Sequence, residues 1–382
     1  RHTRFRNVTG VQTCALPIYV GEGANVSFFD ADNDGLMDLI IGNYGYFQND
    51  TLHPYLSELA YFKNTGTVTT PQFNLVTTDY ANLSQYNLTG IHPTFADMDG
   101  DNDKDMIVGD EWGNVHYFTN TAPFGQPANF SLTGAVWFGI DAGKFAAPTV
   151  FDLNKDGLKD LILGNELGKL CYYQNTGSVT SPQFASGLGY SNFGGVSVSQ
   201  FPSIKGYSSP VFFDNNGNTE LLVAAECGNI YYYDHIDNNL TGTFSLMDSV
   251  YKSIYEPVRP SIDLFDLNYD GKKDLVMGNY AGGAMIYYQF SNVGIGEATA
   301  GNSFFSLYPN PANNYVIIKS DFNDFEKANL VVTDVTGRTV YSAELGKNYF
   351  DINTTGWKSG LYFCIVSDGS KTKAVKFEIH NH

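Results

Sequence analysis

The sequence predicts an all-β protein in which a ring of repeated β-sheets is followed by a small β-sandwich. An aspartate-rich loop recurs five times between residues 30 and 274, and a unit of four strand-like segments accompanies each copy. No stretch shows a sustained 3.6-residue helical periodicity. The composition agrees, because aromatic residues reach 15%, glycines number 39 and charged residues make up only 16%.

The recurring loop places oxygen-bearing side chains at positions 1, 3, 5 and 9, usually with glycine at position 6. This spacing suits calcium, which takes roughly six to eight oxygen ligands, while glycine relieves the sharp bend that turns alternate side chains inward. The intact copies supply, in order, Asp30, Asp32, Asp34 and Asp38; Asp97, Asp99, Asp101 and Asp105; Asp152, Asn154, Asp156 and Asp160; and Asp266, Asn268, Asp270 and Asp274.

Acidic surface turns without any metal are the alternative interpretation of these loops. Charge repulsion argues against it, because several carboxylates within about 4 to 6 Å raise one another's pKa and cost stability unless a cation is present. We therefore predict about four calcium sites. They are expected to be structural, since one hairpin fills each set of ligand positions. The copy that starts at Asp214 is two residues too short and is expected to bind weakly or not at all.

Each loop is followed by a short apolar run such as LIIGN, MIVGD or LILGN. An EF-hand would need a bidentate glutamate at position 12 and flanking helices. Position 12 is apolar here, as Ile41, Val108, Leu163 and Met277. The runs therefore predict strands that are buried on both faces.

The repeat unit contains three further strand-like segments. A first strand begins near a proline, at Pro93, Pro148, Pro210 and Pro260, and a third is rich in tyrosine, as in AYFKNTG and LCYYQNTG. A fourth opens with PQF at Pro71 and Pro182. The first aspartates are 67, 55, 62 and 52 residues apart. Four strands at this period predict β-propeller blades with long loops, and a β-solenoid or tandem sandwiches are the alternatives.

The loop and the YYxNTG segment together resemble the FG-GAP or VCBS-type repeats of the integrin α-subunit head and of many secreted bacterial proteins. The resemblance covers about residues 25–290. It implies a propeller with calcium in the hairpin between the first two strands of a blade. Such propellers generally have seven blades, and five are visible here. We therefore expect that upstream sequence supplies one or two further blades and the missing fourth strand of the last one.

Residues 291–303 form a small-residue linker, and residues 304–382 form a separate module. Residues 19–303 carry 32 acidic and 11 basic side chains, a net −21, whereas the last 79 residues carry eight of each. Alternating segments around the Thr336-Gly337 and Asp368-Gly369 turns predict a seven-stranded Ig-like sandwich.

This C-terminal module resembles the type IX secretion sorting domain. The motifs that carry the resemblance are YPNP at Pro309 and Pro311, D-x-x-G-R around Gly337, and the GLY sequence that begins at Gly360. It implies contact with the type IX secretion machinery and a protein that is secreted or attached to the outer-membrane surface.

Residues 1–18 contain VTGVQTCALPI, which looks like a translated sequencing adapter, so we exclude them from fold reasoning and place the propeller at residues 19–290. The four cysteines show no metal or disulfide spacing. No run of about 18 apolar residues predicts a transmembrane segment. The acidic charge excludes nucleic acid as a favoured partner.

Two functions remain after this reading. The first is a calcium-stabilised binding or adhesion module for an extracellular protein or carbohydrate, using rim loops rich in tyrosine, asparagine and Trp112. The second is a polysaccharide lyase or hydrolase. Catalytic motifs are scarce, so binding is favoured. A propeller turn would present the glutamates after the second strands, Glu111, Glu166 and Glu226, on one face; solvated turns are the favoured interpretation, and a glycan-binding or acid/base feature is the alternative. His92, His116 and His235 are expected in packing or surface roles rather than in catalysis.

Overall fold

A computed structural model describes residues 11–16, 20–47, 55–187, 189–200, 203–255, 258–289, 305–308, 312, 314–320, 328–334, 338–345, 349–367 and 372–379. The chain divides into two compact units, residues 1–290 and 291–382. The expected linker, the YPNP prolines, Gly337 and the Asp368-Gly369 turn lie outside the described residues. No helix in the described ranges is long and apolar enough to cross a membrane.

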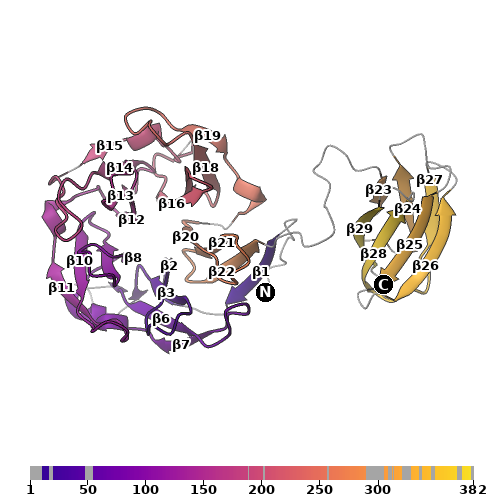
Figure 1. The fold of residues 1–382 in the computed structure, drawn as a ribbon, viewed down its shortest axis with the longest axis horizontal. Helices are drawn as coiled ribbons and strands as arrows, with labels where there is room; N and C mark the ends of the chain where they lie inside the picture. Colours follow the sequence, from indigo (N-terminus) through magenta and orange to yellow (C-terminus); the bar gives the residue numbers. More distant parts are fainter. Residues whose placement is uncertain are drawn as a thin grey trace. The chain divides into compact units, whose positions relative to one another are not determined.

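The first unit contains five four-stranded antiparallel sheets arranged like the blades of a β-propeller (Figure 1). Blade 1 is β2 (Asn25–Phe29), β3 (Asp38–Gly42), β6 (Leu59–Asn64) and β7 (Phe73–Thr77). Blade 2 is β8 (His92–Ala96), β9 (Asp105–Gly109), β10 (Val115–Asn120) and β11 (Phe130–Gly134). Blade 3 is β12 (Ala147–Phe151), β13 (Asp160–Gly164), β14 (Leu170–Tyr173) and β15 (Tyr190–Ser191).

Blade 4 is β16 (Ser209–Asn215), β17 (Asn218–Ala224), β18 (Ile230–Asp234) and β19 (Ser245–Asp248). Blade 5 is β20 (Ser261–Phe265), β21 (Asp274–Gly278), β22 (Ala284–Gln289) and β1 (Val11–Leu16). A small hairpin joins β4 (Tyr46–Phe47) to β5 (Tyr55–Leu56). Short 3-10 turns η1 (Tyr80–Tyr86), η2 (Trp137–Gly139), η3 (Phe193–Gly195) and η4 (Tyr251–Ser253) lie between blades or strands.

The first strands of the five blades contact one another in cyclic order, β2 with β8, β8 with β12, β12 with β16, β16 with β20, and β20 with β2. Blade 5 meets blade 1 through the same kind of contact that joins the other neighbouring blades. Our expectation that upstream sequence adds further blades stays a prediction. The Ala24 amide donates to the Asn279 carbonyl at 3.0 Å, as the Ser208 amide does to the Asn165 carbonyl at 3.1 Å.

Glycine at the end of a second strand permits this close approach. A Cβ on Gly164 would lie 2.0 Å from the Ser208 carbonyl oxygen, and one on Gly278 would lie 2.2 Å from the Ala24 carbonyl oxygen. The residue after the glycine then closes the next turn, because the Asn165 side chain accepts hydrogen bonds from the Leu167 and Lys169 amides. The GN motif of the sequence therefore builds the junction between blades.

Residues 11–16, which we had excluded from fold reasoning, pair with β22 antiparallel and take the place of the fourth strand of blade 5. Their origin in an adapter stays a prediction. The second strands β3, β9, β13 and β21 are buried at every position, as the apolar runs predicted. Cys171, Cys227 and Cys364 are free thiols.

The second unit has, among its described residues, a three-stranded and a four-stranded antiparallel sheet. The three-stranded sheet is β23 (Phe305–Tyr308), β24 (Tyr315–Ser320) and β27 (Tyr349–Asn353); the other is β26 (Thr339–Leu345), β25 (Ala328–Asp334), β28 (Gly360–Ser367) and β29 (Thr372–Ile379). One apolar core joins the two sheets, with Val316 and Ile352 from the first and Val332 and Cys364 from the second. The Ig-like topology stays a prediction.

Candidate functional site

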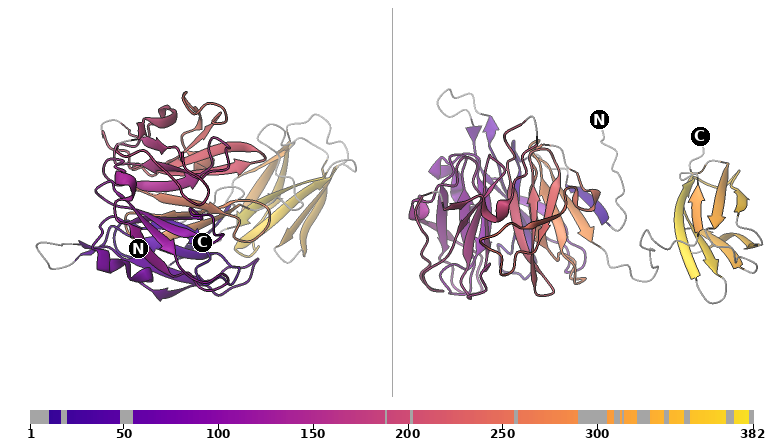
Figure 2. Two further views of the ribbon diagram at one scale, coloured as in Figure 1. Left: turned by 60° about the vertical axis from the view of Figure 1, so that its left-hand side comes forward. Right: turned by 90° about the horizontal axis from the view of Figure 1, so that it is seen from above.

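The strands run from one face of the ring to the other, as the side view shows (Figure 2, right). Each first strand ends at an aspartate-rich loop, or in blade 4 at its shorter counterpart, and begins at the opposite face. The structure therefore separates two candidate sites by one strand of about five residues, or roughly 16 Å. We name the intact loops after their blades: loop 1 (residues 30–38), loop 2 (97–105), loop 3 (152–160) and loop 5 (266–274).

The first aspartate of each loop holds the bend through backbone amides. Asp30 accepts hydrogen bonds from the Asp34 and Gly35 amides at 3.1 and 2.9 Å. The same pair of bonds recurs at Asp152 and Asp266. Loop 2 differs, because Asn102 with φ 71° replaces the glycine and Asp97 accepts from the Gly100 and Asn102 amides.

The last aspartate of each loop is buried and links the loop to the third strand. Asp38 accepts hydrogen bonds from the Ala31 amide, the Tyr61 hydroxyl and the Asn64 amide at 3.0, 3.1 and 2.7 Å. Asp105 and Asp160 repeat this pattern. The tyrosine-rich segment is thus explained, since its tyrosine hydroxyl and asparagine amide serve this carboxylate. Burial raises the pKa of Asp38 and of Asp105 to about 6.

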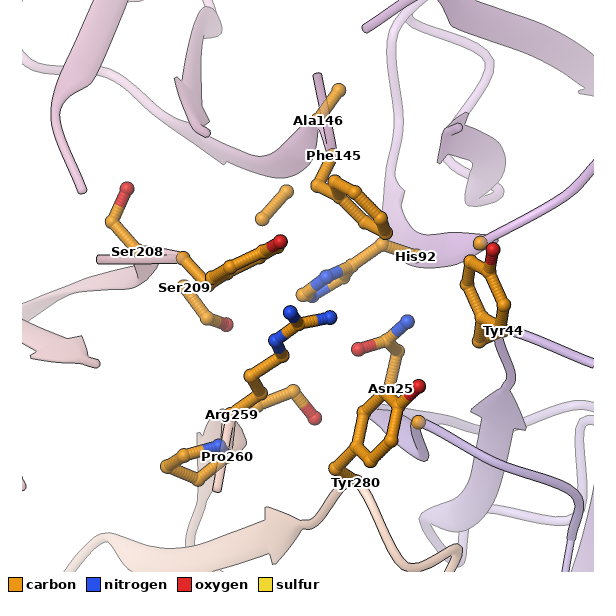
Figure 3. A pocket seen from close by; sticks show the side chains of 15 residues that line it. Asn25, Tyr44, His92, Phe145, Ala146, Ser208, Ser209, Arg259, Pro260 and Tyr280 are labelled. Carbon is orange, nitrogen blue, oxygen red and sulfur yellow. The ribbon is translucent and has the colours of Figure 1, made fainter. Parts of the chain in front are cut away.

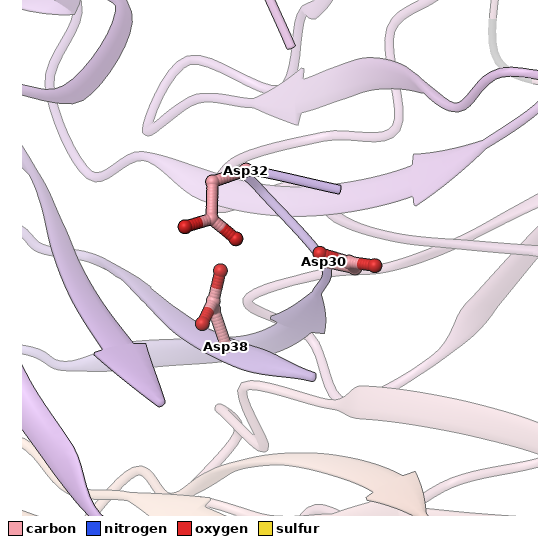
Figure 4. A group of neighbouring side chains, drawn as sticks. All are labelled: Asp30, Asp32 and Asp38. Carbon is pink, nitrogen blue, oxygen red and sulfur yellow. The ribbon is translucent and has the colours of Figure 1, made fainter. Parts of the chain in front are cut away.

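The structure brings two sets of three carboxylates close enough to share one cation. Ligand atoms of Asp30, Asp32 and Asp38 lie within 4.8 Å of one another (Figure 4), and so do those of Asp97, Asp99 and Asp101. Loops 3 and 5 carry asparagine at position 3. There the Asn154 and Asn268 side chains accept hydrogen bonds from the Asp156 and Asp270 amides, at 3.0 Å each.

Unpartnered buried oxygens in loops 1 and 2 indicate that a cation fits there. Asp32 Oδ1, Asp99 Oδ1 and Asp103 Oδ1 are buried without any hydrogen-bond partner. Desolvation raises the pKa of Asp103 to about 6, with Asp101 and Asp105 adding to the shift. Oxygens in this state cost stability unless a proton or cation satisfies them. All of these ligands are hard oxygens, which is the donor set that calcium prefers.

Loop 1 already contacts a cation of the protein itself. Lys63, from β6, forms an ion pair with Asp32 and lies 3.0 Å from the nearest Asp34 carboxylate oxygen. These two carboxylates raise the pKa of Lys63. The corresponding positions in blades 2 and 3 are Thr119 and Gln174. A metal in loop 1 therefore competes with an ammonium group, which sequence reasoning missed because lysine and loop are 25 or more residues apart.

Blade 4 has no room for a comparable loop. Asn215 pairs with Asn218 directly across a two-residue turn, in which Asn216 and Gly217 both have positive φ. This is the geometry of a type I′ hairpin. Lys155 reaches this region from loop 3 and pairs with Asp237 at 2.9 Å.

The second candidate site is a pocket where the first strands begin, and we call it the channel-mouth pocket. It collects residues from all five blades around the ring's axis (Figure 3). Its lining combines aromatic rings with polar groups: Asn25, Tyr44, His92, Phe145, Tyr207, Ser209, Arg259 and Tyr280. The residues recur at equivalent positions, because Phe145, Tyr207 and Arg259 each stand two residues before a first strand.

Arg259 occupies the middle of this pocket on aromatic faces. Its guanidinium carbon lies 3.6 Å from the Tyr207 ring centroid, 5.1 Å from that of Tyr280 and 5.8 Å from that of Phe145. Phe145 in turn stacks against Tyr44 with ring centroids 6.0 Å apart. The aromatic quadrupoles hold the cation in place without consuming its hydrogen-bond donors.

Four glutamates surround the mouth, and each has a partner. Glu166 binds Lys205 at 2.6 Å and accepts from the Tyr207 hydroxyl at 3.0 Å, and the Lys205 hydrogen bond lowers its pKa. Glu226 lies 3.6 Å from Arg259. Glu111 and Glu22 accept hydrogen bonds from the Tyr44 and Tyr280 hydroxyls.

The sequence signal for this pocket was present but was interpreted otherwise. Glu111, Glu166 and Glu226 were assigned to solvated turns, and the structure places them beside the mouth, in contact with pocket residues. His92 was expected in a packing or surface role; it is buried and also lines the pocket. Asn25, His92 and Ser209 are each the first residue of a first strand. An alignment of the repeats at this position would have predicted that the three residues lie together near the axis of the ring. His116 is buried against Asp110 and His235 is exposed.

Comparison with known families identifies both parts of the chain. Residues 97–163 match an FG-GAP-like repeat, and residues 306–380 match a secretion system C-terminal sorting domain. The chain therefore contains an FG-GAP-like repeat and a type IX secretion C-terminal sorting domain. This domain indicates export to the cell surface or medium and contact with the type IX machinery. No curated protein matches the chain.

Solved structures align at low identity. PorZ, a surface component of the type IX secretion system of Porphyromonas gingivalis, aligns at 15% identity and TM-score 0.31, over 91% of this chain and 50% of PorZ, so the chain spans about half of its length. An engineered GH43 glycoside hydrolase aligns at 11% identity and a TM-score of 0.42, over 97% of this chain and 94% of the hydrolase. A family 43 arabinoxylan arabinofuranohydrolase from Bacillus subtilis aligns at 10% identity and a TM-score of 0.41, over 94% of this chain and 95% of the hydrolase.

Proposed function

We propose that this protein is an exported, calcium-stabilised β-propeller that binds an extracellular glycan at the channel-mouth pocket. The single observation that carries the proposal is the lining of that pocket, where Tyr44, Phe145, Tyr207 and Tyr280 present aromatic surface beside Arg259 and buried polar groups. Aromatic faces pack on the apolar faces of sugar rings, while a few placed polar groups fix hydroxyls.

Calcium has a structural role in this proposal. The residues that would hold it are the four loop sets given above, and the ion would neutralise their carboxylates. These loops lie at the opposite ends of the first strands from the pocket, which separates the ions from any bound sugar. The sorting domain adds the export route, through which the propeller reaches a calcium-containing medium.

Binding is favoured over glycoside hydrolysis by the state of the rim carboxylates. A glycosidase needs a carboxylic acid with a raised pKa that can protonate the leaving oxygen. The pKa of Glu166 is shifted the other way by Lys205, and Glu226 faces Arg259. These groups are arranged to hold neighbouring side chains.

A glycan array followed by calorimetry of the best ligands tests this function. We expect Tyr44→Ala to weaken binding by about tenfold or more, as loss of an aromatic anchor does. Phe124→Ala is the matched control, because Phe124 is 91% exposed and lies near loops 1 and 2 on the other face. Turnover of the same polysaccharides by the wild-type chain would instead support the enzyme alternative, and equal binding by both variants would place the site elsewhere.

A further inference from the structure

The floor of the channel-mouth pocket holds a guanidinium group that makes one loose ion pair, with Glu226. The Arg259 side chain is about three-quarters buried, and its Nε lies 3.6 Å from Glu226 Oε1, beyond hydrogen-bond distance. No described residue accepts a hydrogen bond from it. Figure 3 shows the guanidinium between Asn25 and His92, in the middle of the pocket. A guanidinium has five N–H donors, and the loose ion pair with Glu226 leaves donors free to bind an acceptor that enters the pocket.

Two further buried polar groups line the same space without partners. Ser209 is 4% exposed, and its hydroxyl makes no hydrogen bond. His92 is 9% exposed, points toward Arg259 in Figure 3, and makes no hydrogen bond with any described residue. Burial lowers the pKa of His92 to about 4, so its ring is neutral beside the guanidinium and offers one N–H donor.

Shape and donor type together select the chemical group. The guanidinium presents parallel N–H bonds that match a planar carboxylate, with the serine hydroxyl and imidazole N–H as added donors. The pocket is open to solvent on one side, and its volume is about 60 Å³. This admits a substituent of a few heavy atoms, whereas a whole pyranose ring has to stay above it, against Tyr44 and Tyr280.

We propose that the floor of this pocket binds the carboxylate of a uronate residue in an acidic polysaccharide, with Arg259, Ser209 and His92 as donors. The proposal rests on the glycan-binding function above and specifies its ligand. Two of the rim glutamates are paired with cations, Glu166 with Lys205 and Glu226 with Arg259, which reduces the repulsion that these two carboxylates exert on a bound monoanion.

Calorimetry with the full chain at one fixed calcium concentration tests the inference. The probes are trisaccharides of galacturonate, mannuronate and guluronate, each with its methyl ester as the uncharged match. We expect at least one acid to bind, and its ester to bind about 10- to 100-fold more weakly, as the loss of charged hydrogen bonds predicts. Arg259→Gln should remove this preference, and Arg338→Gln, an exposed arginine of the sorting domain, should leave it unchanged.

Ser209→Ala supplies a variant that keeps the fold, because its hydroxyl has no partner to lose. It should weaken binding of the acid and leave binding of the ester unchanged. An ester or neutral glycan that binds as tightly as the acid overturns the carboxylate inference and leaves glycan binding intact. Binding of no saccharide by the folded wild-type chain overturns both proposals.

Discussion

Removing calcium from the full chain is expected to lower the melting temperature of the blade unit. Extracellular calcium modules have dissociation constants of roughly 10⁻⁴ to 10⁻³ M, so about 1 mM calcium stabilises each site by about 0.4 to 1.5 kcal/mol. Loops 2, 3 and 5, which lack a lysine like Lys63, then contribute about 1 to 4.5 kcal/mol together. For a unit of this size the shift is about 2 to 7 °C.

Differential scanning calorimetry with calcium and with excess chelator measures this shift. Asp156→Ala, which removes position 5 of loop 3, should lose part of it. Asp214→Ala is the matched control, because it removes position 1 of the blade 4 copy, where a type I′ hairpin replaces the loop. Equal melting curves with calcium and chelator would refute the reasoning, as would an equal loss of the shift in both variants.

Three other perturbations have defined outcomes. Lys63→Gln, which installs the residue type of blade 3, should add a calcium site of higher affinity at loop 1, measured by calcium titration. Without calcium, the raised pKa values of Asp38 and Asp105 mean that the folded state binds more protons than the unfolded state, so stability should fall as the pH rises from about 4 to 6, and calcium should reverse this trend. Gly164→Ala should cost about 1 to 3 kcal/mol in denaturant unfolding, because its Cβ meets the Ser208 carbonyl oxygen.

Each outcome has a contrary result. Unchanged calcium stoichiometry and affinity in Lys63→Gln would show that the lysine does not compete. Stability that rises with pH in chelator would contradict the assignment of buried, protonated loop carboxylates. The control for Gly164→Ala is Gly157→Ala. Gly157 has a φ of +86°, so alanine is strained there, but nothing lies within 4 Å of the added Cβ and no contact between blades is affected. An equal loss of unfolding free energy in Gly164→Ala and Gly157→Ala would contradict the role of Gly164 in the contact between blades.

The strands of the propeller were predictable because the repeat displays them several times over. The apolar second strands and the tyrosine-rich third strands are both local patterns, and the structure gives each a reason, such as the Tyr61 hydroxyl on Asp38. The number of blades was not predictable in this way. It depends on contacts between residues far apart in the sequence, such as the close approach of Gly278 to Ala24, more than 250 residues away.

The same difference between local and long-range patterns applies to the two candidate sites. The loop ligands lie within nine residues of one another, so spacing alone brought them together. The channel-mouth pocket takes residues from all five blades, and Arg259 meets Tyr207 only because blades 4 and 5 pack side by side. Lys63 at loop 1 escaped notice for the same reason, as its contact crosses from the third strand to the loop.

The placement of loops and pocket at opposite ends of the first strands has a consequence for how this protein responds to its surroundings. If the proposed calcium sites and glycan site both hold, a change in calcium concentration acts on the loop face, away from the pocket, and alters resistance to heat and proteases while leaving the choice of ligand unchanged. Durability and recognition can then vary independently, and a substitution in one face need not be compensated in the other.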